Sequence, residues 1–275
     1  MKCACWIAAI FLTFPLFADD WNGTNYAQNS SVQAFQAKRL IDSVAFQGNE
    51  TILDLGCGDG KITVQIATKV PQGLVIGIDP SSSMLKKAEE IKDVSNLTFK
   101  EGAAEDFSLS ERFDHIFSSY VLHWVKDQDQ ALKNIYDHLK PGGKVHFIIA
   151  TSKEGLPFHA ALQKTCESWK ADLTGFVNTR YFYDIETHRK FLVKAGFHID
   201  GLHYVFRNAT LENKEKFKTW IQQWLPESKY LSVYKQLGFM EELVDHYLEE
   251  MGLSPNTIEP IQWGEYLLIV EASKK

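Results

Sequence analysis

The segment Thr51 to Gly60 restricts the fold of this chain more than any other part of its sequence. It reads TILDLGCGDG, a short apolar run with an acidic residue near its end and then three glycines at alternate positions. Such a run predicts a buried β-strand, and apolar residues at helical spacing over 61–69 predict a helix directly behind it. Glycine has no Cβ and tolerates positive φ, so the turn lets a ligand approach the backbone. The segment therefore predicts a strand, a cofactor-binding turn and a helix.

The glycine spacing distinguishes between classes of nucleotide-like cofactor. A dinucleotide fingerprint, G-x-G-x-x-G, needs a third glycine where this chain has Lys61. A phosphate loop needs Ser or Thr directly after Gly-Lys, and here an isoleucine follows. The pattern D-x-G-x-G-x-G over 54–60 resembles motif I of the class I methyltransferases, which use S-adenosylmethionine. The resemblance implies that Asp54, Gly56 and Gly58 bind this cofactor; a purely structural turn and an NAD-dependent dehydrogenase are the alternatives.

A second predicted strand, over 74–78, ends in Asp79-Pro80, nineteen positions after the last glycine of the turn. An acidic residue at this distance, at the carboxyl end of a strand, is placed to accept hydrogen bonds from both ribose hydroxyls. The alternative for Asp79 is a cap on the next helix, but Ser81 or Ser82 suits that position better. We predict that Asp79 and Pro80 lie at the cofactor.

The loop GAAEDF over 102–107 resembles the adenine-side loop of the same family. Members often have Asp or Asn where this chain has Ala103, and that side chain bonds the adenine amino group. The resemblance implies that the backbone N–H of Ala104 faces the adenine and that Glu105 or Asp106 replaces the missing side chain.

Predicted strands and helices alternate through the first half of the chain. After a third strand over 97–100 come a strand over 113–120, a helix over 128–139, a Lys-Pro-Gly-Gly-Lys turn over 140–144 and a strand over 145–150. This alternation predicts right-handed crossovers and a parallel sheet. With the resemblance, it predicts an α/β fold: a Rossmann-like, mostly parallel seven-stranded sheet with helices on both faces and a C-terminal helical cap.

The second half of the chain predicts the rest of the sheet and the cap. A helix over 185–195 is followed by strands over 199–207 and 265–272, which the resemblance implies are the antiparallel edge. Between these strands, amphipathic helices over 211–224 and 228–251 are broken at Pro226. Their aromatic residues are Phe217, Trp220, Trp224, Tyr230, Tyr234, Phe239 and Tyr247. We expect some of these side chains to pack in the core and others, such as Trp220 and Trp224, to form an apolar lid over the active site.

These predictions divide the chain into a leader and one domain. The methyltransferase domain is expected over 19–275, with its core over 26–150, 185–207 and 265–272, and its cap over 208–262. Hydrophobic residues make up 45% and aromatic residues 13% of the 275 residues, as in a globular protein, and the net charge is −6. The basic residues form no stripe, so nucleic acid is not an expected partner. The nine histidines and the cysteines lack metal-binding spacing, so no metal is expected.

Residues 1–18 predict a secretory signal peptide or a membrane anchor. One lysine precedes a short apolar run, and Ala18 stands before two aspartates. The run is short for a membrane span. Export conflicts with the supply of S-adenosylmethionine, which is made in the cytosol. The protein is therefore expected to be exported or anchored if this segment acts as a signal, and cytoplasmic otherwise.

Two further segments carry a closer resemblance. YAQNSSVQ, from Tyr26 to Gln33, and FDHIFSSYVLHWV, which contains Ser119 and Trp124, are similar to the juvenile hormone acid and trans-aconitate methyltransferases. In carboxyl methyltransferases, a Gln in the entrance segment and a Trp after the fourth strand hold the carboxylate of the acceptor. The resemblance implies this role for Gln33 and Trp124, and it places Tyr26 and Ser119 beside the cofactor.

The chemistry of methyl transfer favours a carboxylate acceptor. Transfer from a sulfonium is an in-line displacement, in which the protein positions the nucleophile and excludes water. A carboxylate, with a pKa near ~4, is already ionised and needs no base. The neutral N–H groups of Gln33 and Trp124 orient it without quenching its charge. We therefore expect a small-molecule acid as acceptor. The alternatives are a hydroxyl, nitrogen or carbon acceptor with His123 as base, or a cofactor-binding protein without catalytic activity.

Overall fold

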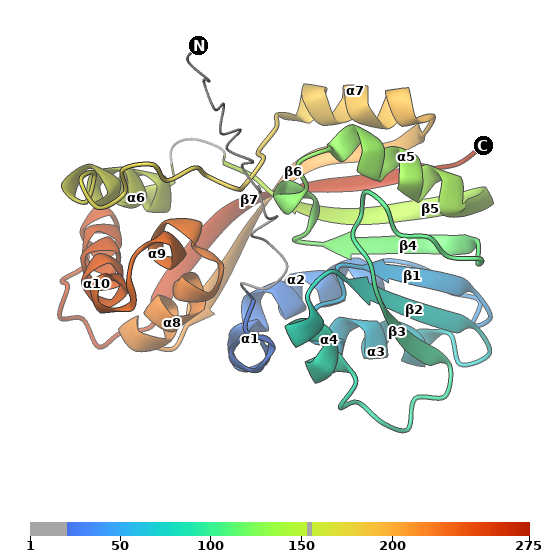
Figure 1. The fold of residues 1–275 in the computed structure, drawn as a ribbon, viewed down its shortest axis with the longest axis horizontal. Helices are drawn as coiled ribbons and strands as arrows, with labels where there is room; N and C mark the ends of the chain where they lie inside the picture. Colours follow the sequence, from blue (N-terminus) through green and yellow to red (C-terminus); the bar gives the residue numbers. More distant parts are fainter. Residues whose placement is uncertain (1–20, 153–155) are drawn as a thin grey trace, which may run out of the picture.

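A computed structural model describes residues 21–152 and 156–275, so the leader predicted over 1–18 lies outside the described residues. The described part is built on a seven-stranded sheet in the order β3-β2-β1-β4-β5-β7-β6 (Figure 1). The strands are β1 (Thr51–Leu55), β2 (Leu74–Asp79), β3 (Leu97–Glu101), β4 (Phe113–Ser119), β5 (Leu139–Ala150), β6 (His198–Leu211) and β7 (Ile261–Ser273). Strands β1 to β5 pair in parallel, and β7 runs antiparallel to both β5 and β6. The predicted sheet, with its antiparallel edge, is confirmed.

Helices cover both faces of this sheet (Figure 1). The helices of the described residues, the cap included, are α1 (Gly23–Asn29), α2 (Ser31–Asp42), α3 (Lys61–Lys69), α4 (Ser82–Ala88), the 3-10 helix η1 (Leu122–Trp124), α5 (Gln128–His138), α6 (Pro157–Ser168), α7 (Ile185–Ala195), α8 (Lys214–Trp224), α9 (Pro226–Tyr230) and α10 (Val233–Glu250). Side chains alternate along β1, so Ile52 packs with α2 and α3, whereas Leu53 and Leu55 pack on the α5 and α7 side. Because β1 is buried on both faces, its sequence is an almost continuous apolar run.

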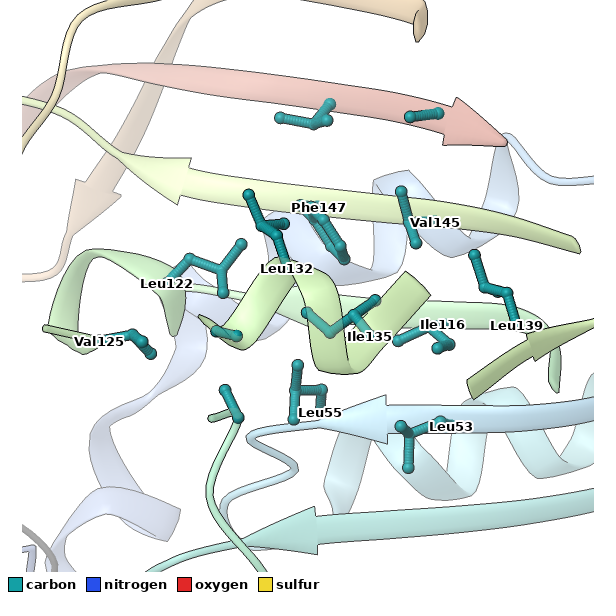
Figure 2. Packing of buried hydrophobic residues seen from close by; sticks show 14 of the residues in the cluster. Leu53, Leu55, Ile116, Leu122, Val125, Leu132, Ile135, Leu139, Val145 and Phe147 are labelled. Carbon is teal, nitrogen blue, oxygen red and sulfur yellow. The ribbon is translucent and has the colours of Figure 1, made fainter. Parts of the chain in front are cut away.

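The core between the sheet and α5 fixes the strand ends that carry the site (Figure 2). Leu53 and Leu55 of β1 and Ile116 of β4 pack in one cluster with Leu132 and Ile135 of α5. All five side chains are almost completely buried. Burying a side chain of this size contributes about 1.5–3 kcal/mol. The carboxyl ends of β1 and β4 are therefore held firmly next to each other.

The turn predicted over 140–144 is an irregularity inside β5 instead. The pairing of β5 with β4 jumps from Leu139 to Lys144, which leaves the intervening residues bulged. Gly142 has φ +78 there, a conformation that favours glycine. Its N–H donates to the carbonyl of Lys274 at 2.7 Å, beyond the end of β7. The end of the chain thus pairs with the expected turn, and β5 begins earlier than predicted.

Strands β6 and β7 are longer than the predicted 199–207 and 265–272. They remain paired along their whole length, as far as Leu211 and Ile261. One end of this pair closes the edge of the sheet, while Leu211 and Ile261 are buried among the helices of the cap. We call the β6–β7 pair the shared ribbon, because it belongs to the core sheet and to the cap (Figure 1).

The cap has a hydrophobic core of its own, formed by α6, α8, α10, the residues that flank α9 and the far end of the shared ribbon, with Val32 of α2 packed into it. Its buried side chains are Val32, Phe158, Ala161, Leu211, Phe217, Trp220, Ile221, Leu225, Leu231, Phe239, Met240, Leu243, Val244, Tyr247, Leu248, Ile261 and Trp263. Helix α6 packs along α10 and was not predicted from the sequence. Proline at the first position of α6 is a helix-start signal, but only Phe158, Ala161 and Thr165 of its residues are buried. The cap therefore begins before the predicted residue 208.

Two details of the predicted cap helices are wrong. The first helix begins at Lys214, because Leu211 completes β6 and the Asn213 side chain accepts a hydrogen bond from the Lys216 N–H at 3.0 Å. Pro226 starts α9 rather than only breaking a helix, since proline fits the first helical position. A second break, at Leu231 and Ser232, separates α9 from α10.

The aromatic residues of the cap divide into two groups. Phe217, Trp220, Phe239 and Tyr247 are buried in the cap core. Trp220 and Trp224 were expected to form the lid, but Trp220 is buried in this core and Trp224 is partly buried against it. Tyr230 and Tyr234 are 48% and 94% exposed.

We expect a chain that lacks residues 1–18 to fold and to bind cofactor. The shortened chain keeps Trp21, which packs edge-on against Tyr26 and Trp124 at 5.7 and 5.6 Å between ring centroids. Circular dichroism and cofactor titration of the truncated and full chains check this. Loss of folding or of cofactor affinity would show that residues 1–18 are structural. Within the described residues, no helix is long and apolar enough to cross a membrane.

Candidate functional site

The glycine turn connects β1 to the carboxyl end of β2. The N–H groups of Gly56 and Cys57 both donate to the carbonyl of Ile78, at 2.8 and 2.9 Å. Gly56 has φ +76, and a Cβ at this position would overlap the side chain of Val121. Gly58 has φ +55 and lies against the ring of Tyr26. Only glycine gives the turn this shape, so the backbone between β1 and α3 stays open to a ligand.

Asp79 connects this turn to the end of β2. Its Oδ2 accepts from the Gly58 N–H and its Oδ1 from the Ser81 N–H, both at 2.9 Å. The carboxyl group is buried, and burial raises its pKa. A carboxylate has about four lone-pair sites, so each oxygen keeps one for a ligand hydroxyl. Ser81 caps α4 as expected, and Pro80 is exposed beside the turn.

Asp54 lies buried beneath the same turn. Its Oδ2 accepts a hydrogen bond from the Thr63 hydroxyl of α3 at 2.7 Å. Burial, with a smaller contribution from the Asp79 charge, raises the pKa of Asp54 to about 7. A cationic ligand group near this carboxyl would favour its ionised form. Asp54 is therefore suited to the charged methionyl end of a cofactor.

Helix α1 brings Tyr26 against the glycine turn. Burial, followed by the charges of Asp59, Asp79 and Asp54, raises the pKa of the Tyr26 phenol. Lys61, which replaces the third glycine of a dinucleotide motif, pairs with Asp59 at 3.0 Å and donates to the carbonyl of Ala27 in α1. Lys61 departs from the dinucleotide fingerprint in the sequence, and in the structure it also ties α1 to the turn.

The adenine-side loop is held by helix α5. Asn134 donates from Nδ2 to the carbonyl of Ala104 at 3.2 Å, and Gln130 donates to that of Glu105 at 3.4 Å. Ala104 is buried, and burial raises the pKa of Glu105. Neither amide was predicted, because nothing in the sequence marks which side chains of α5 face this loop. Ser119 is half-buried at the carboxyl end of β4.

His123 is buried in η1 and is poorly suited to act as a base. Its ring stacks on Phe182 at 5.8 Å, and its carbonyl accepts from the Tyr181 N–H at 2.7 Å. Burial, with a smaller contribution from the Arg180 charge, lowers the pKa of His123 to about 3. The imidazole is therefore neutral at physiological pH and only 4% exposed.

Trp124 and Gln33 lie on the cap side of the turn. Trp124 is half-buried, and Trp21 packs against it. Gln33 accepts from the indole N–H of Trp220, in α8, at 3.0 Å. This bond joins the side-chain carbonyl of Gln33 to the cap. The amide N–H groups of Gln33 are therefore the part of the side chain that can donate to a ligand. In the described part of the chain, no hydrogen bond joins Gln33 directly to Trp124.

The structure gathers Asp54, Gly56, Gly58, Asp79 and Tyr26 around one turn at the carboxyl edge of the sheet. No group of three or more His, Cys, Asp or Glu side chains within 21–152 and 156–275 is arranged to hold a metal ion.

Comparison with known proteins identifies the family. A family model described as a methyltransferase domain matches residues 46–223, well over half of the chain. The chain is a class I methyltransferase. Its cofactor is S-adenosylmethionine, which the pattern at the glycine turn predicts.

Curated relatives of the methyltransferase match it over different lengths. It is 28% identical over 258 residues to the putative methyltransferase 235L of Invertebrate iridescent virus 6. The match covers 91% of this chain and 92% of the relative. It is 31% identical over 156 residues to the trans-aconitate 2-methyltransferase of Deinococcus radiodurans, covering 57% and 59%. The juvenile hormone acid O-methyltransferase of Bombyx mori is 31% identical over 132 residues, covering 44% and 48%. The chain thus spans only about half of the relatives with named acceptors.

Solved structures agree on the fold of the methyltransferase. A putative methyltransferase from Bacillus halodurans superimposes with a TM-score of 0.59 at 19% identity, covering 87% of this chain and 99% of that one. A phosphoethanolamine N-methyltransferase from Haemonchus contortus gives a TM-score of 0.58 at 21% identity, covering 92% and 57%. Both matches show the fold alone.

Proposed function

We propose that this methyltransferase transfers a methyl group to the carboxylate of a small, partly apolar acid and forms a methyl ester. The observation that carries the proposal is the bond between Gln33 and Trp220. It occupies the Gln33 carbonyl, so the amide presents N–H groups, which suit an anionic acceptor. Two curated relatives, the trans-aconitate and juvenile hormone acid methyltransferases, carry carboxylic acids in their names.

The cofactor fits the turn that the structure describes. Asp79 keeps lone pairs for the ribose hydroxyls, and the backbone at Gly56 and Gly58 is open to close approach. When bound, S-adenosylmethionine supplies an electrophilic methyl group on its sulfonium. The protein then has to orient the acceptor in line and exclude water. We assign orientation to Gln33 and Trp124, whose neutral N–H groups leave the nucleophilic charge of a carboxylate intact.

The alternative of a base-assisted reaction has less support. A hydroxyl or nitrogen acceptor of high pKa needs a base, and His123 was the proposed one. Its neutral, buried imidazole with a pKa of about 3 is too weak for that role. A carboxylate acceptor needs no base.

A product screen tests the proposed function. The purified chain is incubated with methyl-labelled S-adenosylmethionine and a panel of small acids, alcohols, phenols and amines. The expected product is a methyl ester, which loses its label as volatile methanol after alkaline hydrolysis. Label that is stable to alkali would favour a hydroxyl, nitrogen or carbon acceptor. Cofactor binding without transfer to any class of acceptor would favour the non-catalytic alternative.

We expect the pH profile of kcat/KM to show no step that belongs to His123. With a pKa lowered to about 3, His123 stays neutral as pH rises from 5 to 8, so no activity should be gained through its deprotonation. His123→Asn should keep most activity and the same profile. A rise near ~6.5, the ordinary pKa of histidine, that disappears in the variant would restore the base-assisted mechanism.

A further inference from the structure

The shared ribbon places a carboxyl group between the core and the cap. Glu265 of β7 accepts a hydrogen bond at Oε1 from the hydroxyl of Tyr120, at 2.7 Å. Tyr120 is the first residue after β4, so this bond reaches from the strand end beside the cofactor turn, across β5, to β7. The mechanism proposed above uses neither residue.

The neighbours of Glu265 belong to the acceptor side of the site. Trp263 precedes it by two positions and therefore points to the same face of β7. The Trp263 ring lies 4.9 Å from that of Trp220, whose N–H is bonded to Gln33. One continuous set of contacts thus leads from the residue proposed to hold the acceptor carboxylate to Glu265.

The backbone of Tyr120 is held in a conformation that is unusual for its residue type. Its φ is +61, which is uncommon for any residue except glycine and is strained for an aromatic one. Its N–H donates to the carbonyl of Ile148 at 2.8 Å, which fixes this conformation. Strained residues of this kind cluster at ligand-binding sites, where the surrounding structure maintains them.

Glu265 lacks a full charge partner among the described residues. Arg207 stands directly opposite it in the β6–β7 register, yet within the described ranges no cationic side chain, Arg207 included, contributes to the electrostatics of Glu265. Burial raises the pKa of Glu265 to about 7, and the bond from Tyr120 opposes this rise in part. One neutral donor leaves lone pairs on a carboxylate that accepts about four hydrogen bonds.

We propose that Glu265, held by Tyr120, accepts a hydrogen bond from a hydroxyl or ammonium group of the acceptor. The acceptor would then be a hydroxy acid or an amino acid rather than a plain or dicarboxylic acid. This inference rests on the proposed function, because it takes the methylated group to be a carboxylate near Gln33. A hydroxyl or ammonium donor favours the ionised form of Glu265 and supplies the missing partner, whereas a second carboxylate would have to share a proton with it.

Matched acids test the inference. 4-Methylpentanoate, 2-hydroxy-4-methylpentanoate and leucine share one carbon skeleton and differ only at carbon 2; octanoate and 8-hydroxyoctanoate place the hydroxyl at the far end. Binding to the full chain saturated with S-adenosylhomocysteine is measured by calorimetry, and methyl ester formation is measured separately. The variants are Glu265→Gln, Tyr120→Phe and, as a control on the same strand, Glu271→Gln.

We expect at least one donor-bearing acid to bind about 10-fold more tightly than its parent. Glu265→Gln should remove most of this preference, Tyr120→Phe part of it, and Glu271→Gln none. If binding shows the preference but no ester forms, the inference stands and the proposed function fails. If esters form with a preference that Glu265→Gln leaves unchanged in a folded protein, the inference fails and the proposed function stands. Absence of binding by all five acids counts against the inference.

Discussion

Asp79→Ala is expected to weaken the binding of S-adenosylmethionine by roughly 100- to 10,000-fold. Two hydrogen bonds from the ribose hydroxyls to a charged carboxylate are worth about 1.5–3 kcal/mol each. The weaker binding has a second cause in the structure, because the same carboxylate accepts hydrogen bonds from the N–H groups of Gly58 and Ser81. The variant loses both the ribose bonds and the anchor of the glycine turn. Calorimetric titration with S-adenosylhomocysteine measures the loss.

Two further variants isolate the cause of this loss. Asp79→Asn keeps the size and one oxygen acceptor, so it should fall between the alanine variant and the wild type. Asp200→Ala removes an exposed aspartate at the start of β6 and should leave affinity unchanged. Unchanged affinity in a folded Asp79→Ala protein would remove Asp79 from the cofactor site.

Gln33→Glu is expected to lower kcat/KM for acids by at least about 100-fold while cofactor binding stays nearly constant. A glutamate still accepts the bond from the Trp220 N–H, so the tie to the cap is kept. It removes the amide donors and places a like charge near the acceptor carboxylate, which costs about 4 kcal/mol at 4 Å in a partly screened site. Gln33→Ala is a less specific test, since it also leaves the buried Trp220 N–H without its partner.

Trp124→Phe completes this comparison. It keeps the aromatic packing against Trp21 and deletes one N–H donor, so turnover should fall by roughly 10- to 100-fold, as expected for a bond to a charged group. Gln163→Glu changes an exposed residue of α6 in the same way. It is the matched control and should leave kcat/KM for acids unchanged. Equal activity of Gln33→Glu and Gln163→Glu on acids would overturn the assignment of Gln33.

The cofactor turn was predictable because its evidence is local. The strand, the glycines and Asp79 follow one another within about thirty residues, and their spacing is set by strand and turn geometry. The structure confirmed the sheet that follows from them. That Asp79 also holds the turn, by accepting from the Gly58 N–H, was not visible in the spacing.

The acceptor side was predictable only in part, because it is assembled from distant segments. Gln33 and Trp220 are 187 positions apart, and Tyr120 and Glu265 are 145 apart. No periodicity connects such residues, and only the pairing of β6 with β7 places Glu265 opposite Arg207. Helix α6 escaped prediction for a related reason: it is recognised by its packing on α10 rather than by a strong apolar face.

The length of the shared ribbon limits how the enzyme can choose an acceptor. Beyond a bulge between Ile199 and Gly201, backbone pairing runs regularly from Gly201 to Leu211 in the cap, so a swing of the cap would have to bend or break it. At about 3.4 Å per residue, this ribbon fixes the span between the cap and the cofactor turn. If the acceptor is an acid, as proposed, this fixed span predicts that the enzyme selects acids by the distance from their carboxylate to their far end.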